Sequence, residues 1–229
     1  MNKILKFSAI VLLASSTTLM AQMSGPSIGV SASGMRAKVS GSQGGNAPSA
    51  SGEIDRTLYV AAIDAEYTAN LDKSWDISFG VSYIPFKGKI GDESRSDTDQ
   101  QTAGGGAGTT TSSGTNSATG ELKNHFTFYI EPTYLLSKDS GIYGKVGYLY
   151  SDLELKSSNI TGSSLNKTIN AEGWQAGLGY KTMVDKNTFV KFELSYSNYN
   201  KLSATSDSGN TFSADPEIYA ATIAVGYKF

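Results

Sequence analysis

The sequence predicts an all-β fold, an eight-stranded antiparallel up-and-down β-barrel, and three observations carry this prediction. Apolar and polar residues alternate with a period of two in seven segments, as expected of strands, whose successive side chains point to opposite faces. The connections between the segments are short and long in turn. The 229 residues are rich in Gly, Ser, Thr and Tyr and include no cysteine, a composition that suits strands better than helices.

The alternation is clearest between Trp75 and Tyr83, where aromatic and aliphatic residues occupy every odd position. The seven segments span residues 59–68, 75–83, 125–136, 142–151, 173–181, 190–197 and 219–229. An eighth strand is expected at 27–39, although its apolar face changes between Ala32 and Met35. A β-bulge near Gly34 would reconcile the two faces.

The connections have the rhythm of a barrel with short turns at one end and long loops at the other. Tight turns are expected near residues 71–74, 137–141 and 184–188, and long polar loops at about 40–56, 87–124, 152–170 and 201–217. Three short and four long connections join eight strands. Residues 102–120, which are mostly Gly, Ser and Thr, are expected to be flexible because they can bury little apolar surface.

The first residues have the layout of a secretory signal peptide. Two lysines precede an apolar run from Phe7 to Ala14, and small and polar residues continue to Ala21. The apolar run is too short to span a bilayer as a helix, which takes roughly 20 residues. We therefore expect residues 1–21 to be removed on export and residues 22–229 to form one barrel domain.

The polar faces of the strands decide which way the apolar faces point. In a water-soluble barrel the outer face would be rich in Lys, Glu and Asp, whereas here it would carry Gly, Ala, Ser and Thr with a few charges. Small residues and paired charges suit a narrow barrel interior. The sequence therefore predicts a transmembrane barrel with its apolar side chains in lipid, and a secreted soluble β-protein is the alternative.

Aromatic residues gather near both ends of the expected strands. Trp and Tyr collect in this way at the two interfaces of a membrane barrel. We predict two aromatic girdles made of Tyr59, Tyr67, Trp75, Tyr83, Tyr134, Tyr150, Trp174, Tyr180, Tyr196, Tyr219 and Tyr227.

The last nine residues, Ala221 to Phe229, alternate and end on an aromatic residue. This ending resembles the C-terminal signature of bacterial outer-membrane barrels, and the whole mature chain resembles the small eight-stranded barrels of the OmpA transmembrane domain, OmpX and opacity-protein kind. The resemblance implies a location in the outer membrane of a Gram-negative cell. It also implies that the barrel-assembly machinery reads the final strand, with Phe229 as the assembly signal.

Charged residues on the polar faces would meet inside the barrel. Because charges in a narrow interior are costly unless paired, we expect an ion-pair plug made of Asp64, Glu66, Asp76, Glu131, Lys145, Lys181, Lys191, Glu193 and Lys228. Resembling barrels with such interiors do not conduct freely. Above the plug we expect an outward-open vestibule lined by Ala62, Gly80, Ser82, Thr127, Gly173, Gln175, Ser195 and Thr222.

No constellation of residues marks a catalytic or metal site. The one histidine, His125, is expected to be an ordinary polar residue near the outer end of its strand, and the chain offers no cysteine as a metal ligand. Removing residues 1–21 leaves 17 basic and 21 acidic residues, a net charge of −4 (17 − 21), and nothing suggests nucleic-acid binding. No cofactor is expected.

The sequence thus favours a non-enzymatic barrel with a structural or surface role, such as envelope stability, adhesion or ligand contact. Its expected partners are outer-membrane lipid, lipopolysaccharide, the barrel-assembly machinery and an extracellular ligand at the loops. A narrow porin for small solutes is the alternative. A lipid A-modifying barrel enzyme is a third and weaker reading, because the local His-Ser motif of the deacylases is absent.

Overall fold

The computed structural model describes residues 23–45, 50–102, 109–158, 164–205 and 210–229, and the predicted signal peptide, residues 1–21, lies outside these ranges. The described chain forms ten strands. They are β1 (Gly25–Gly45), β2 (Ala50–Asn70), β3 (Trp75–Ile84), β4 (Gly88–Thr102), β5 (Thr109–Ser137), β6 (Ser140–Ser158), β7 (Ser164–Met183), β8 (Thr188–Tyr199), β9 (Leu202–Thr205) and β10 (Asn210–Lys228). Within these ranges no helix is long and apolar enough to span a membrane.

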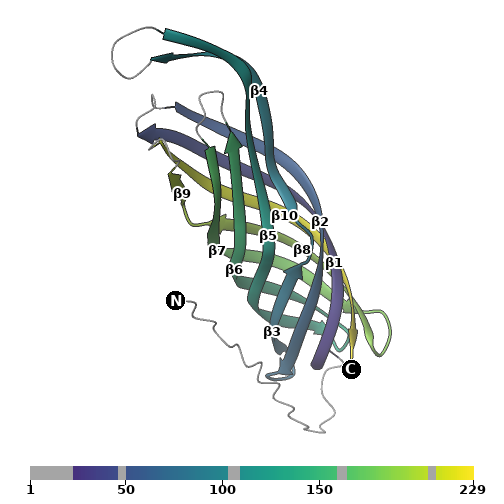
Figure 1. The fold of residues 1–229 in the computed structure, drawn as a ribbon. Coiled ribbons are helices and arrows are strands. Elements are labelled where there is room, and N and C mark those ends of the chain that lie inside the picture. The colour runs from purple at the N-terminus through teal and green to yellow at the C-terminus, as the bar shows by residue number, and fades with distance from the viewer. Residues whose placement is uncertain (1–22, 46–49, 103–108, 159–163, 206–209) are drawn as a thin grey trace, which may run out of the picture.

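Eight of these strands close into a ring. They follow the order β1-β2-β3-β5-β6-β7-β8-β10, and β10 returns to pair with β1 from Ser27↔Lys228 onward. Every neighbouring pair is antiparallel, while β4 continues the wall along β5 and β9 continues it along β10. The predicted eight-stranded up-and-down barrel is confirmed (Figure 1).

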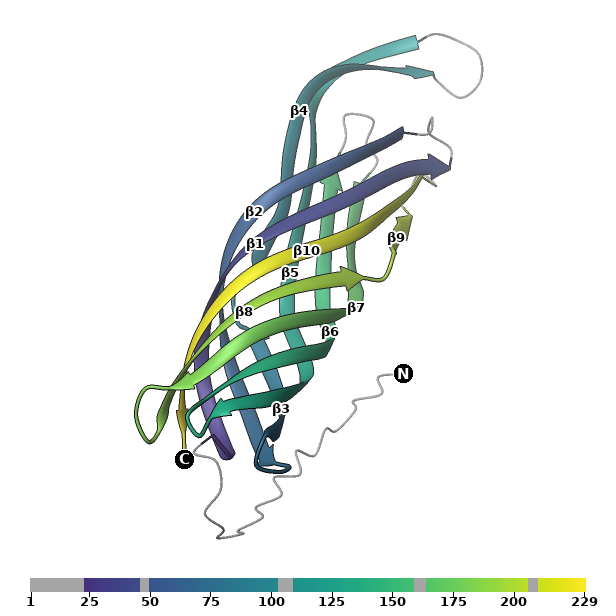
Figure 2. The ribbon, with the colours of Figure 1, turned by 180° about the vertical axis from the view of Figure 1, so that it is seen from behind.

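The tight turns and the C-terminus lie together at one end of the barrel, which we call the turn end (Figures 1 and 2). Aspartates close two of these turns. Asp72 Oδ1 accepts the backbone N–H of Ser74 at 2.6 Å, and Asp185 Oδ1 accepts those of Asn187 and Thr188, each at 2.8 Å. The two backbone N–H groups that Asp185 accepts hold the pKa of its carboxyl below the usual range.

At the opposite end the strands run on as long antiparallel hairpins, which we call the hairpin arms (Figure 2). The long connections expected at 40–56, 87–124, 152–170 and 201–217 consist mostly of strand in their described residues. The longest arm pairs β4 with β5 from Gly88↔Leu122 to Thr102↔Thr109. Backbone hydrogen bonds hold a hairpin whatever its side chains, and alternation disappears where both faces meet water.

The expected bulge near Gly34 is wrong, because the register of β1 with both neighbours is continuous. Met35 and Ala37 therefore face the lumen, and Ala37 is only 3% exposed. Arg36 lies on the outer face and pairs with Asp55 at 3.0 Å. The apolar pattern changes face because the outside of the strand changes from lipid to water, while the lumen stays enclosed.

The barrel is apolar outside and charged inside. Among the outward side chains Val146, Leu178 and Leu194 are 66%, 73% and 69% exposed, whereas the inward Glu131 and Asp76 are 0% and 1% exposed. A water-soluble protein would expose such large apolar residues only singly. This polarity suits a wall whose outer face lies in lipid.

The eleven aromatic residues predicted to form girdles are all exposed or half-buried, and several contact one another on the outer wall in edge-on or tilted arrangements. Trp75 contacts Tyr134 near the turn end, with ring centroids 5.2 Å apart. Towards the arms Tyr196 lies 5.5 Å from Trp174 and 5.1 Å from Tyr219. Their position at the two membrane interfaces stays a prediction.

Both tryptophans are expected to lose fluorescence in bilayers of brominated lipid. Trp75 and Trp174 are 44% and 48% exposed on the outer wall, and Trp favours the interface, so bromines near the headgroups should quench more strongly than bromines at the bilayer centre. Trp75→Phe and Trp174→Phe variants separate the two signals. Fluorescence that brominated lipid leaves unchanged would contradict the girdle prediction.

Candidate functional site in the barrel lumen

Strand pairing divides the lumen into two charged walls. Asp64 and Glu66 on β2, Asp76 on β3 and Glu131 on β5 are carboxylates on adjacent strands. Lys145, Lys181 and Lys191 come from β6, β7 and β8, and Glu193 of β8 stands among them. The barrel therefore brings together charges that lie up to 125 positions apart in the sequence.

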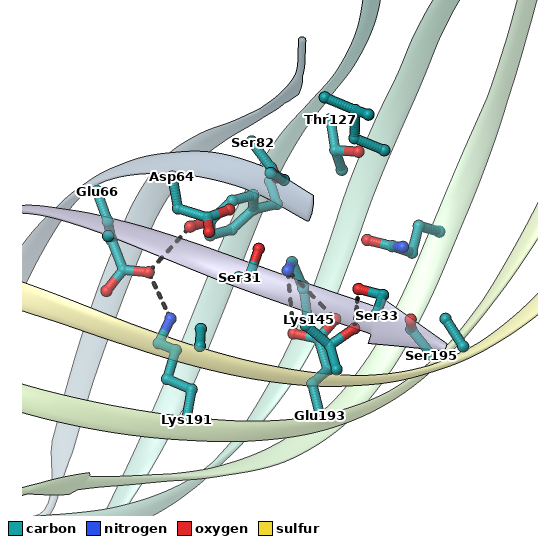
Figure 3. Close-up of a pocket in the computed structure, with 18 of the residues that line it drawn as sticks. Ser31, Ser33, Asp64, Glu66, Ser82, Thr127, Lys145, Lys191, Glu193 and Ser195 are labelled. Carbon is teal, nitrogen blue, oxygen red and sulfur yellow. Dashed lines mark hydrogen bonds and ion pairs between the residues drawn. The ribbon is translucent and has the colours of Figure 1, made fainter. Parts of the chain in front are cut away.

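Glu66 is the centre of the ion-pair network. Its Oε1 accepts from Lys181 Nζ at 2.8 Å, and its Oε2 accepts from Lys191 Nζ at 2.6 Å. Lys191 also donates to Glu131 at 2.6 Å, and the hydroxyl of Tyr129 donates to Glu66 at 3.1 Å. All these side chains are buried, so the pairs are little screened by solvent. Figure 3 shows the contact between Glu66 and Lys191.

A second ion pair lies beside the first group. Lys145 Nζ donates to Glu193 at 3.0 Å, and the Tyr143 hydroxyl donates to the same carboxylate at 3.2 Å. Lys145 lies 4.2 Å above the ring of Tyr129, while Lys191 lies 5.0 Å from the ring of Tyr143. These cation–π contacts join the two groups into one network across the lumen.

Glycines make room for the aromatic rings of this network. Tyr129 pairs directly with Gly80 and Tyr143 with Gly179 on the neighbouring strand. A Cβ atom at either glycine would lie 2.3 Å from the ring, which is too close for any real contact. Each ring therefore lies flat against a glycine, an arrangement known to stabilise glycine in sheets.

The sequence analysis gave no role to Tyr129, Tyr143 or Phe189, although Tyr129 and Tyr143 share the inner face with Glu131 and Lys145. The ring of Phe189 lies over Gly226 and under Lys181 Nζ at 4.6 Å. The signal was available, because Phe189 lies two residues from Lys191 and shares its face.

Six of the nine residues expected in the plug meet in the network: Glu66, Glu131, Lys145, Lys181, Lys191 and Glu193. The structure does not place the other three in it. Asp76 accepts a hydrogen bond from the side-chain amide of Asn70 at 2.8 Å. Lys228 lies half-buried at the turn end. Asp64 lies on the arm side of Glu66 on the same strand.

A cavity lies on the arm side of the network (Figure 3). It offers about 80 Å³ to the centres of water molecules. Six of the eight residues expected to line a vestibule line it: Ala62, Ser82, Thr127, Gln175, Ser195 and Thr222. Gly80 instead lies against the ring of Tyr129, and the other exception is Gly173, which pairs with Tyr199.

The small and polar lining expected for the vestibule does not continue along the arms. Farther along the arms a buried apolar cluster contains Leu149, Leu153, Ala171, Tyr199 and Leu202. Strands that continue beyond the membrane bury these side chains against one another, as in a soluble sheet. The vestibule is thus a cavity between the ionic network and an apolar cluster.

His125 lies half-buried in the cavity wall. Its ring nitrogens lie 3.3 Å from the Tyr199 hydroxyl and 3.4 Å from that of Thr127. A nucleophile–base–carboxylate relay would need a carboxylate on one of these nitrogens. Within the described ranges no group of three His, Cys, Asp or Glu residues can hold a metal ion.

Comparison with known proteins agrees with this geometry. A family model described as an outer membrane protein β-barrel domain matches residues 7–229. The outer membrane protein OprG from Pseudomonas aeruginosa is similar with a TM-score of 0.54 and 15% identity, over 91% of this chain and 99% of that one. At this identity the likeness shows the fold alone.

Two further solved structures are more distant. The outer membrane protease OmpT from Escherichia coli has a TM-score of 0.48 and 10% identity, over 94% of this chain and 100% of its own. Ail, the attachment invasion locus protein of Yersinia pestis, has a TM-score of 0.46 and 11% identity, over 90% and 100%. No curated protein matches the chain.

Proposed function

Since this chain belongs to the outer membrane protein β-barrel family, we propose that it is a non-enzymatic barrel that stabilises the envelope and presents its hairpin arms outside the cell. It resides in the outer membrane of a Gram-negative cell. The observation that carries the proposal is the buried network of Glu66, Lys181, Lys191 and Glu131 across the lumen. With its lumen blocked, the barrel can contact partners only through its wall and its arms.

The outer wall at the base of the arms supports contact with lipopolysaccharide. Arg36 pairs with Asp55, Lys123 with Glu154, and Lys201 approaches Asp215 at 3.9 Å. Apart from Lys201, which lies between β8 and β9, these groups are on strands, just beyond the girdle residues Tyr59, Tyr150 and Tyr219 on the side of the arms. Mixed charges at this level can hydrogen-bond to phosphates and sugars, while the arms reach an extracellular ligand or another cell.

Shortening an arm tests the role of the arms. In a variant with residues 90–120 replaced by a two-residue turn, the barrel wall up to Gly88↔Leu122 remains paired. We expect this variant to keep the heat-dependent gel shift of a folded barrel but not to restore detergent resistance to cells that lack the protein. Full restoration by the shortened variant would contradict the proposal.

The mass spectrum of lipid A tests the non-enzymatic part of the proposal. We expect this spectrum to be unchanged in cells that express the unaltered protein, and a changed spectrum would favour an enzyme.

A narrow porin is the second candidate, and the hydroxyl-lined cavity beside the network favours it. Planar-bilayer recording separates the two. The blocked lumen predicts a conductance close to that of the bare bilayer, and steady single-channel steps in the unaltered protein would make the porin the better account.

Deletion of Phe229 is expected to reduce assembly in cells by an order of magnitude while leaving folding in detergent nearly unchanged. Phe229 is 71% exposed and contacts Tyr227 edge-on with centroids 5.4 Å apart, so its loss removes few internal contacts. The amount of heat-modifiable protein in the outer membrane is compared with the yield refolded in detergent. Leu136→Ala, a change at another exposed residue of the outer wall, is the control. Equal losses in both assays would show that Phe229 acts through stability.

A further inference from the structure

The buried part of the lumen contains more carboxylates than lysines, counted over the described residues. Glu66, Glu131 and Glu193 share the three lysines of the network. Asp76 and Asp64 remain outside it. Asp76 accepts the Asn70 amide through Oδ1, but its Oδ2, like Glu131 Oε2 and Asp64 Oδ2, is buried without a hydrogen-bond partner. Of these three carboxylates only Asp64 lines the lumen cavity. An ionised carboxylate in this position is costly unless a positive charge compensates it.

Asp64 stands in the wall of the lumen cavity with room in front of it. Its direct neighbours across the sheet are Gly29 on β1 and Ser82 on β3, and Ser31 lies on the same face of β1. Figure 3 shows Asp64, Ser31 and Ser82 around the cavity. On β1 and β10 most of the side chains that line the cavity are small, among them Ser27, Gly29, Ser31, Ser33, Thr222 and Ala224.

The network cannot compensate Asp64. Lys191 and Lys181 are bound by Glu66, and Lys145 is bound by Glu193. A charge that compensates Asp64 can therefore come only from solvent, and the size of the cavity limits which ion can enter. One water needs about 10–15 Å³ by the same measure, so about 80 Å³ holds a small ion with several waters and no large organic cation.

We propose that this cavity binds a small monovalent cation, sodium or potassium, between the carboxylate of Asp64 and the hydroxyls of Ser31 and Ser82. One carboxylate supplies one negative charge, and hydroxyl oxygens with retained waters complete the ligands. Calcium takes six to eight oxygens, including several from carboxylates, and the described part of the chain has no group of three acidic or histidine residues that could hold a metal. The site does not depend on the proposed role of the arms.

The test is the dependence of barrel stability on the cation present. Unfolding of the protein in zwitterionic detergent is followed by circular dichroism in the chlorides of sodium, potassium and N-methyl-D-glucamine at equal ionic strength. The organic cation is too large for the cavity. Binding to the folded state alone raises the unfolding midpoint, and we expect sodium or potassium to raise it by about 3 °C. Equal ionic strength removes general screening from the comparison.

Matched variants locate the effect. Asp64→Asn keeps the shape of the side chain and should abolish the difference between the salts, whereas Asp55→Asn, which alters an exposed carboxylate paired with Arg36, should retain it in full. The Ser31→Ala/Ser82→Ala variant keeps the charge of Asp64 and should reduce the difference, and it decides the matter if Asp64→Asn does not fold. Equal midpoints in all three salts, or a difference that survives in these lumen variants, would overturn the site. The assay measures neither conduction nor adhesion, so a negative result would contradict the cation site without contradicting the proposed function.

Discussion

Replacing Glu66 by alanine is expected to destabilise the folded barrel by about 3–5 kcal/mol, because it leaves buried lysines without their carboxylate. Lys181 keeps no other ion-pair partner in the network, and Lys191 keeps only Glu131. The free energy of unfolding is measured from the folded fraction on unboiled gels across a urea series.

The control for this change is an ion pair on the outside. Asp55→Ala removes the exposed partner of Arg36 and should leave the free energy of unfolding nearly unchanged, because solvent screens exposed ion pairs. A Glu66→Leu/Lys181→Met variant, which removes both charges of one pair, should recover part of the loss. If Glu66→Ala and Asp55→Ala cost the same, the network does not stabilise the barrel.

The Glu66→Ala variant is also expected to conduct more ions across planar bilayers than the unaltered protein. Glu66 holds Lys181, Lys191 and Tyr129 in place through hydrogen bonds of 2.6 to 3.1 Å. Without it the side chains lose the partner that fixes them across the lumen, and water can enter. A folded Glu66→Ala barrel that shows no ionic conductance would indicate that other groups close the lumen.

Replacing Gly80 by leucine is the second change with a large expected effect, a destabilisation of about 3 kcal/mol, the upper end of the cost of overpacking, or failure to fold. Even a Cβ atom at Gly80 would lie 2.3 Å from the Tyr129 ring. The ring would have to leave its place, and its bond to Glu66 and its contact with Lys145 would be lost with it. Refolding yield and the urea midpoint on unboiled gels measure the effect.

Gly144 provides the matched control. It lies in the barrel wall on β6, and a Cβ atom there would meet nothing within 4 Å. Gly144→Leu should therefore refold with nearly normal yield. A second change, Tyr129→Ala, should restore part of the stability of the Gly80 variant because it frees the space. Normal folding of Gly80→Leu alone would contradict the close packing of ring and glycine.

Much of the barrel could be predicted from the sequence because the membrane imposes a simple pattern. Lipid on one side and a narrow lumen on the other force alternation, so strands such as 75–83 could be located one by one. The inner face of each such strand followed from parity, which placed Glu66, Lys181 and Lys191 in the lumen.

The arms and the face of β1 could not be predicted, since the pattern depends on the environment. Where lipid gives way to water the outer face turns polar, as at Arg36, and the inner face turns apolar, as at Ala37 and Leu153. In the sequence this change of polarity has the pattern expected of a bulge or a loop, although the backbone pairing continues unbroken through β1.

The sequence by itself determined the fold class, the number of strands in the wall and the residues that face inward, because these follow from local alternation and the spacing of turns. Only the tertiary structure decided which inward residues meet. Lys191 binds Glu66 from 125 positions away, Tyr129 covers Gly80, and Asp64 is left beside a cavity without a partner. Such contacts depend on register, on side-chain length and on closure of the ring, which join strands that are distant in the chain.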